Sequence, residues 1–215
     1  MRKMYLFLII GLIADLTFGQ RKAVEVSHYV YPEFIKGSVL MKSGVKNEAM
    51  LNYNALTEEM IFIKDGKNLA ITRLEDIDTV YIGETKFIIL KNKFVEILYH
   101  NKYDLYAGYK GSIVDPGKPA AYGGTSQTSS VTSYSTFLSN GQAYALQLPE
   151  GVETKGSTDY WLKKDGQVQL FVNLRQLARL FEDKSDLFKK YVKENKVKYE
   201  NEESVVGLIK FMEKN

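Results

Sequence analysis

The feature that most constrains the fold is a change of hydrophobic period along the chain. From Val24 to Asn101, apolar runs of roughly three to seven residues alternate with turn residues at intervals of about eight to twelve residues. From Asn173 onward, apolar residues recur at helical spacing instead. The first pattern is typical of a meandering antiparallel sheet. The sequence therefore predicts an α+β protein, in which an antiparallel β-sheet domain, rolled or sandwich-like, is followed by a three-helix C-terminal segment.

Two dipeptides are the clearest local signals for hairpins. Asp65-Gly66 and Asp165-Gly166 each separate two apolar runs. Asp-Gly is favoured in two-residue hairpin turns, because both central residues of such a turn have a positive φ. Each dipeptide therefore predicts an antiparallel pair of strands.

Three apolar stripes predict the helices of residues 173–215. The stripes are Leu174, Leu177, Leu180 and Phe181; Leu187, Phe188, Tyr191 and Val192; and Val205, Val206, Ile209 and Met212. Ser185 and Asn201 are candidate N-caps of the second and third helices, and Asn195 is a candidate stop for the second. We expect this helical segment to pack as a cap on the β domain, residues 20–172.

A long loop is predicted near residues 110–140. Asp115–Pro119 is a turn cluster, and residues 123–136 are rich in Gly, Ser and Thr. Such a composition offers little to bury and cannot offset the entropy lost on ordering. A long loop inside a compact domain is usually functional or disordered, so this segment is a candidate place for function.

The first residues have the pattern of a secretory signal. Arg2 and Lys3 precede an apolar run over residues 4–14, which is shorter than the roughly 20 residues of a membrane-spanning helix. Small residues then lead to a cleavage point near Gly19–Gln20. The sequence predicts a signal peptide over residues 1–19, no transmembrane span in the mature chain, and a final location in the periplasm or at the cell surface.

Charge and cysteine content exclude several classes of protein. The chain has 29 Lys and Arg against 26 Asp and Glu, a net charge of +3, which is too small to indicate nucleic-acid binding. Cysteine is absent, which excludes disulfides, Cys-ligated metal sites, thiol nucleophiles and a lipid-modified cysteine anchor. We expect no cofactor, no metal and no nucleic-acid partner.

The catalytic inventory favours a non-enzymatic protein over an enzyme. His28 and His100 stand in no catalytic motif, and the common hydrolase, metalloprotease and nucleotide-binding patterns are absent from the sequence. Acidic residues cluster at 58–59 and 75–78, in predicted turns where solvated acids are normal. The alternative is a carboxylate-dependent hydrolase of an extracytoplasmic polymer, which needs two carboxyl groups about 5–10 Å apart across a cleft.

Tyrosine is the one enriched side chain with binding chemistry, at 15 residues beside a single Trp. Those in or beside the irregular segment are Tyr99, Tyr103, Tyr106, Tyr109, Tyr122, Tyr134 and Tyr144. A rigid apolar ring with a polar tip suits contact with a glycan, a peptide or an envelope protein, and we predict a ligand-binding region here. The alternative is that these tyrosines cover a half-buried sheet. The spacing of Tyr103, Tyr106 and Tyr109 prevents all three from sharing one face of a strand.

Several stretches beyond the signal carry a resemblance to other proteins. They are Gly37–Met41, Leu51–Asn54, Glu59–Ile63 and Phe171–Met212. In these stretches the chain resembles uncharacterised exported proteins of the Bacteroidetes. The resemblance implies a periplasmic or surface location in a Gram-negative cell and no known activity. Asp78-Thr79-Val80 also resembles the three-residue acceptor for O-glycosylation in that group.

Overall fold

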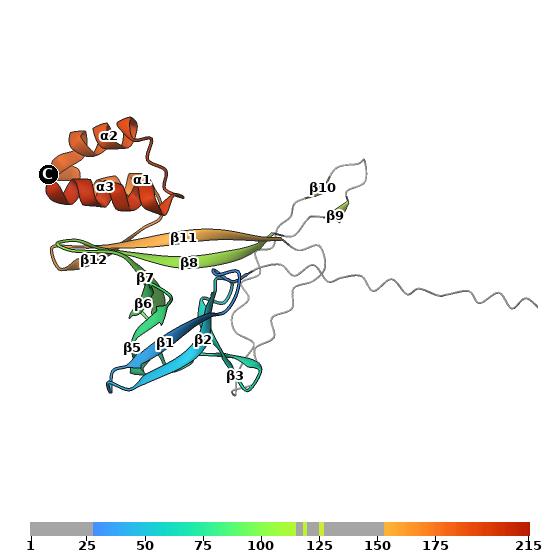
Figure 1. Ribbon diagram of the computed structural model, residues 1–215. Helices are drawn as coiled ribbons and strands as arrows, with labels where there is room; N and C mark the ends of the chain where they lie inside the picture. The colour runs from blue at the N-terminus through green and yellow to red at the C-terminus, as the bar shows by residue number, and fades with distance from the viewer. Residues whose placement is uncertain (1–27, 115–117, 120–124, 127–152) are drawn as a thin grey trace, which may run out of the picture.

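The computed structural model describes residues 28–114, 118–119, 125–126 and 153–215. Within these residues the chain forms a large antiparallel sheet followed by C-terminal helices, which confirms the predicted α+β class (Figure 1). The predicted signal peptide and its cleavage point lie outside the described residues, as do Tyr122, Tyr134 and Tyr144.

The main sheet has ten strands in the order β12-β11-β8-β7-β6-β5-β1-β2-β3-β4, in which β1–β4 and β5–β8 each form a meander and β1 pairs with β5. Its strands are β1 (Ile35–Met41), β2 (Lys46–Asn54), β3 (Glu59–Lys64), β4 (Lys67–Ala70), β5 (Ile77–Ile82), β6 (Thr85–Leu90), β7 (Lys93–His100), β8 (Asp104–Val114), β11 (Glu153–Lys164) and β12 (Gln167–Phe171). A separate pair is formed by β9 (Lys118–Pro119) and β10 (Thr125–Ser126). Within β1–β4 and within β5–β8, each strand pairs with the next strand in the sequence, and β11 adds beside β8.

Both predicted hairpins are confirmed. Asp65 and Gly66 join β3 to β4 with φ angles of 51° and 70°, and Asp165 and Gly166 join β11 to β12 with φ angles of 51° and 77°. Two consecutive positive φ angles are the signature of the tight turn that fits the twist of a hairpin.

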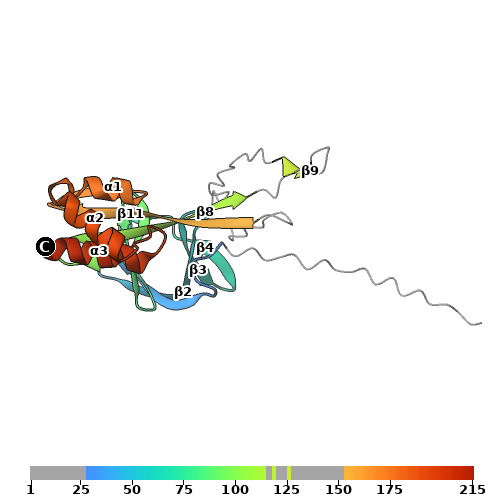
Figure 2. The same cartoon turned by 90° about the horizontal axis from the view of Figure 1, so that it is seen from above.

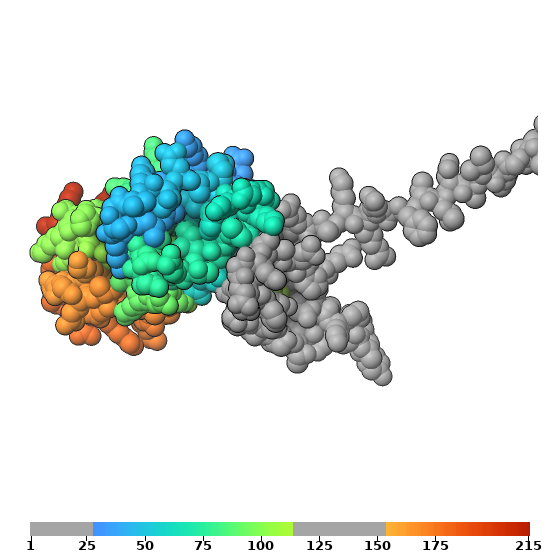
Figure 3. Space-filling model, turned by 90° about the horizontal axis from the view of Figure 1, so that it is seen from below, coloured from blue at the N-terminus to red at the C-terminus, as the bar shows by residue number. Residues whose placement is uncertain are grey.

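The sheet rolls up, so that the segment after β2 returns to contact β8. The Gly111 N–H donates to the Ala55 carbonyl at 2.7 Å, and the Tyr53 hydroxyl donates to the Tyr109 carbonyl at 3.3 Å. The interior of the roll is filled by Leu51, Tyr53, Met60, Val80, Ile82, Phe87 and Phe94. Figure 3, from the side away from the helices, shows the strands of the roll forming the surface. The described residues form a rolled sheet and not a sandwich.

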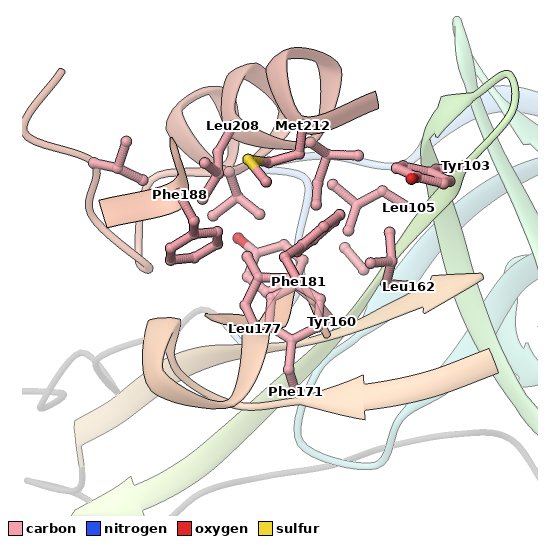
Figure 4. Packing of buried hydrophobic residues seen from close by; sticks show 14 residues of the cluster. Tyr103, Leu105, Tyr160, Leu162, Phe171, Leu177, Phe181, Phe188, Leu208 and Met212 are labelled. Carbon is pink, nitrogen blue, oxygen red and sulfur yellow. The ribbon is translucent and has the colours of Figure 1, made fainter. Parts of the chain in front are cut away.

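The helices cover one face of β8, β11 and β12 (Figures 1 and 2). They are α1 (Leu174–Arg179), α2 (Ser185–Glu194) and α3 (Glu202–Lys214), with short 3-10 turns at η1 (Leu74–Asp76) and η2 (Glu182–Lys184). The core between helices and sheet includes Tyr103, Leu105, Tyr160, Leu162, Phe171, Leu177, Phe181, Phe188, Leu208 and Met212 (Figure 4). The predicted apolar stripes therefore bury against the sheet.

Two of the three predicted helix boundaries are confirmed. The Asn201 side chain accepts from the Ser204 N–H at 2.7 Å and caps α3, and Asn195 ends α2. The predicted N-cap at Ser185 is wrong, because the η2 turn runs directly into α2 and makes Ser185 the first helical residue.

The predicted start of the long loop near residue 110 is also wrong. β8 continues as a regular strand to Val114, paired with β11 along its whole length. Tyr106 and Tyr109 therefore lie in a strand and not in a loop.

Candidate functional site

A cavity of about 570 Å³ opens beside the second half of β8 and the first half of β11. This cavity, here named the ribbon groove, is lined by His28–Val30, Ala55–Leu56, Tyr109–Gly111, Thr154–Thr158, Val172 and Tyr199–Glu200. The lining comes from the segment before β1, the turn after β2, the two strands and the approach to α3. Parts of the chain that are distant in the sequence thus form one concave surface.

The floor of the groove is a stretch where β8 and β11 extend beyond their other neighbours. β7 pairs with β8 only as far as Ala107, and β12 pairs with β11 only from Tyr160 onward. β8 and β11 nevertheless stay paired to Val114 and Glu153 (Figure 1). Residues 108–114 and 153–159 therefore form a two-stranded ribbon.

Two glycines shape this floor. Gly111 and Gly156 face each other across the ribbon. A Cβ on Gly111 would lie 2.8 Å from Cδ2 of Leu56, whereas a Cβ on Gly156 would meet nothing within 4 Å. Gly111 thus lets the turn after β2 rest on the ribbon, and Gly156 leaves the floor beside it open.

Tyr199 forms a wall of the groove and is held firmly. Its hydroxyl donates to the Thr158 carbonyl at 2.5 Å and lies 3.4 Å from the Phe171 carbonyl. Its ring packs edge-on against Tyr160, with ring centroids 5.1 Å apart. Burial raises the pKa of Tyr199, so the hydroxyl stays a hydrogen-bond donor at neutral pH.

Tyr109 stands behind the groove at the centre of an acidic cluster. Its hydroxyl donates to Glu96 Oε2 at 2.5 Å, and the carboxyl group of Glu202, the first residue of α3, lies close enough to raise the pKa of Tyr109 further. Burial raises the pKa of Glu96 and of Glu202, although the bond to Tyr109 opposes both shifts. A phenol has one proton to donate, so two neighbouring carboxylates cannot both be satisfied by it. Neither carboxyl group lines the ribbon groove.

The structure divides the predicted tyrosines rather than bringing them together. Tyr103 and Tyr106 are only 2% and 8% exposed, and Tyr99 and Tyr109 are half-buried. Tyr103 and Tyr109 belong to the helix-facing core, whereas Tyr106 packs with Trp161 on the other side of the sheet. This alternation agrees with their spacing. Of the four described, Tyr109 alone lines the ribbon groove.

Tyr99 and Tyr103 contribute to docking the end of α3. The Glu213 carboxylate accepts from the Tyr99 hydroxyl at 3.1 Å, from Asn101 Nδ2 at 2.7 Å and from the Tyr103 N–H at 2.9 Å. These bonds join the last turn of α3 to the connection between β7 and β8.

Tyr106 serves a buried carboxylate on the opposite face. Asp104, which is 5% exposed, accepts from the Tyr106 hydroxyl at 3.1 Å and from Lys163 Nζ at 3.2 Å, and His100 Nδ1 lies 2.5 Å away. Burial alone would raise the pKa of Asp104, but hydrogen bonds from His100, Lys163 and Tyr106 hold it below its usual range. His100 is the last residue of β7, and its contact with Asp104 joins the ends of β7 and β8.

The acidic clusters noted in the sequence make local contacts. Glu58 pairs with Lys93 at 2.5 Å, and Asp76 pairs with Arg73 at 3.5 Å. Asp78 accepts from the hydroxyl of Thr79, which is buried in β5. Across the described part of the chain, no group of three or more His, Asp or Glu residues is placed to hold a metal ion.

Most of the groove's lining was not predicted. Tyr29, Leu56 and Tyr199 have no shared motif and no common spacing, and they meet only because the sheet rolls and the helices fold back. His28, which stands in no catalytic motif, also lines the groove, and its ring is tilted against that of Tyr29 with centroids 4.4 Å apart.

Among the described residues, no helix has the length and apolar character needed to cross a membrane. No protein-family model matches the chain, and searches of curated proteins and of solved structures find no match either.

Proposed function

We propose that this protein is a non-enzymatic binding protein of the cell envelope, and that it holds its ligand in the ribbon groove. The observation that carries the proposal is the groove itself. Its volume of about 570 Å³ lies in the range of ligand-binding pockets. Tyr29, Tyr109 and Tyr199 supply aromatic faces, and Leu56 supplies an apolar one.

The shape of the lining supports an extended ligand. Five consecutive residues of β11, Thr154–Thr158, line the groove, which corresponds to about 13 Å of strand at roughly 3.3 Å per residue. Polar residues, Thr154, Thr158 and Glu200, line the groove beside the aromatic ones. A polymer, a peptide or a segment of a partner protein fits such a surface better than a compact metabolite.

The envelope location rests on the N-terminal sequence. A basic start, an apolar run and small residues before Gln20 support export, and the resemblance to exported proteins supports the periplasm or the cell surface. Fractionation of cells that express the full chain, with N-terminal sequencing of the product, tests this part of the proposal.

A carboxylate-dependent hydrolase is the second candidate. Glu96 accepts from the Tyr109 hydroxyl, and burial raises the pKa of both Glu96 and Glu202, which is the environment that suits a general acid. Because neither carboxyl group lines the ribbon groove, this candidate needs a substrate to reach the pair by another route.

The test of the binding function fills the groove. Gly156→Tyr places a ring over the floor where a side chain meets nothing within 4 Å, and Ser112→Tyr adds the same ring to the ribbon at a residue outside the groove. The chain from Gln20 onward and both variants are screened against a glycan array and a random dodecapeptide phage library. We expect the parent and Ser112→Tyr to bind the same ligand and Gly156→Tyr to bind it at least tenfold more weakly. Equal binding by Gly156→Tyr, or no ligand in either screen, would overturn the proposal.

A further inference from the structure

We infer that the ligand of the ribbon groove is an extended peptide from another protein, which adds as a strand to the outer edge of β11 beyond the end of β12. The inference rests on the proposed function, because it names the ligand class of the same groove. It follows from the pairing of the strands, the direction of their backbone groups and the space at Gly156.

The edge in question begins where β12 ends. β12 pairs with β11 from Lys164↔Gln167 to Tyr160↔Phe171 and goes no further. From Asp159 back toward the start of β11, the described residues place no strand on that side of the sheet. An incoming strand there would continue the line of β12.

The outward direction of the backbone groups can be determined residue by residue. The Lys155 carbonyl accepts from the hydroxyl of Ser112 in β8 at 3.3 Å, so it faces β8. The Thr158 carbonyl accepts from Tyr199, so it faces outward. Backbone groups alternate along an antiparallel ladder. The N–H and C=O of Gly156 and the N–H of Thr158 therefore point outward, whereas those of Ser157 point toward β8.

The other edge of the same ribbon shows what a covered edge looks like. There the Gly111 N–H donates to the Ala55 carbonyl and the Tyr109 carbonyl accepts from Tyr53. On the β11 edge, Tyr199 satisfies the Thr158 carbonyl, but the described part of the chain offers no partner to the outward groups of Gly156. The protein itself closes one edge, whereas at Gly156 the described residues leave the other edge uncovered.

A peptide backbone matches these groups better than a glycan does. An extended strand presents N–H and C=O groups at a two-residue repeat, and its addition to a sheet edge is a recurring mode of peptide recognition. Gly156 has no Cβ, and an added Cβ would meet nothing within 4 Å, so no side chain of this residue hinders the approach of a second backbone. At the junction with β12, the Thr158 carbonyl already accepts from the Tyr199 hydroxyl, so the added strand would pair with the N–H and C=O of Gly156 and with the N–H of Thr158.

The side chains around the edge define the chemistry of the peptide. On the groove side the peptide would meet the rings of Tyr199 and Tyr29 and the side chain of Leu56. On the other side it would pass exposed Lys155. Because side chains of a strand alternate between faces, the peptide should carry apolar residues toward the groove and an acidic residue toward Lys155.

The test separates backbone recognition from side-chain recognition at one position. Gly156→Pro removes the outward N–H while leaving the bonds to β8, and Gly156→Ala keeps the N–H. The probe is a synthetic peptide enriched from the random dodecapeptide library on the chain from Gln20 onward. We expect Gly156→Pro to weaken binding at least tenfold and Gly156→Ala to change it less than threefold. N-methylation of alternate residues of the peptide gives the same information without altering the protein, and should weaken binding only at every second residue.

Amide hydrogen exchange supplies an independent readout. In the free protein the Gly156 and Thr158 amides should exchange quickly and the Ser157 amide slowly, and the peptide should protect the first two. Protection of Gly156 and Thr158 without peptide would overturn the inference, because this chain's own segments, or a second copy if protection rises with concentration, would then hold the edge.

The remaining outcomes distinguish this inference from the proposed function. If a peptide or glycan binds and Gly156→Tyr abolishes binding, but Gly156→Pro behaves like Gly156→Ala, the groove is the site and strand addition is wrong. If Gly156→Tyr also leaves binding unchanged, both proposals fail.

Discussion

The carboxylate of Glu213 should be a main anchor of the helical cap. In Glu213→Ala, the Tyr103 N–H loses its acceptor in a residue that is only 2% exposed, which costs about 1–3 kcal/mol. The bonds from Tyr99 and Asn101 are more exposed and contribute roughly 0.5–1 kcal/mol together after discounting for solvent. We expect the free energy of unfolding to fall by about 1.5–4 kcal/mol.

Urea denaturation of the chain from Gln20 onward measures this loss, with comparable m-values required for all variants. Glu213→Gln keeps an oxygen for the Tyr103 N–H and should lose about half as much. Lys214→Ala, an exposed change in the same helical turn, is the matched control and should cost less than about 0.5 kcal/mol. A Glu213→Ala loss as small as that of Lys214→Ala would refute the role of this carboxylate in docking α3.

Three further changes test the electrostatics and the ribbon. Burial raises the pKa of Glu96 above its ordinary 4.5, so its contribution to stability is complete below about pH 4.5 and is lost as the pH rises through the folded-state pKa. Glu96→Gln should therefore stabilise the protein at pH 8, with a gain in urea midpoint that vanishes toward pH 4.5. Asp104 has the opposite sign, because its folded-state pKa lies below the ordinary 3.8. Asp104→Asn should destabilise the protein at pH 7 by an amount that shrinks as acid protonates Asp104 in the parent, and a constant difference down to pH 2 would contradict this. Gly111→Ala drives a methyl group into Leu56 and should lower the free energy of unfolding, measured by urea denaturation, by about 1–3 kcal/mol. Gly156→Ala, whose methyl group meets nothing within 4 Å, should lower it by less than about 0.5 kcal/mol. Equal losses would contradict the packing of Leu56 on the ribbon.

The parts of the fold that could be predicted are those with local causes. The Asp-Gly turns need only two adjacent residues that tolerate a positive φ, and the Asn201 cap needs only a side chain and an N–H three residues later. The apolar stripes of the helices were readable for the same reason. Each of these signals acts within a few residues of the structure it specifies.

The second half of β8 could not be predicted, because its glycines serve distant partners. Gly108 and Gly111 give this stretch the composition of a loop. In the structure a Cβ on Gly108 would lie 2.6 Å from the ring of Trp161, and Leu56 occupies the space beside Gly111. Both glycines make room for side chains that are about 50 residues away in the sequence or more. Tyrosine enrichment did not show which rings are exposed, because Tyr103 and Tyr106 are core residues.

The groove lies where the helical cap and the rolled part of the sheet diverge from each other over the face of the ribbon. The interior of the roll and the helical cap lie on the same face of the sheet, and Tyr109 packs against both clusters. Beyond Tyr109 the ribbon continues, but Leu56 covers it from one side and Tyr199 from the other, leaving Gly156 between them uncovered. Beyond Tyr109, the described side chains of the ribbon belong to neither buried cluster, so this stretch adds little to the hydrophobic core. Substitutions at Gly156 should therefore leave the fold intact, which is the property that the proposed binding experiments at this position need.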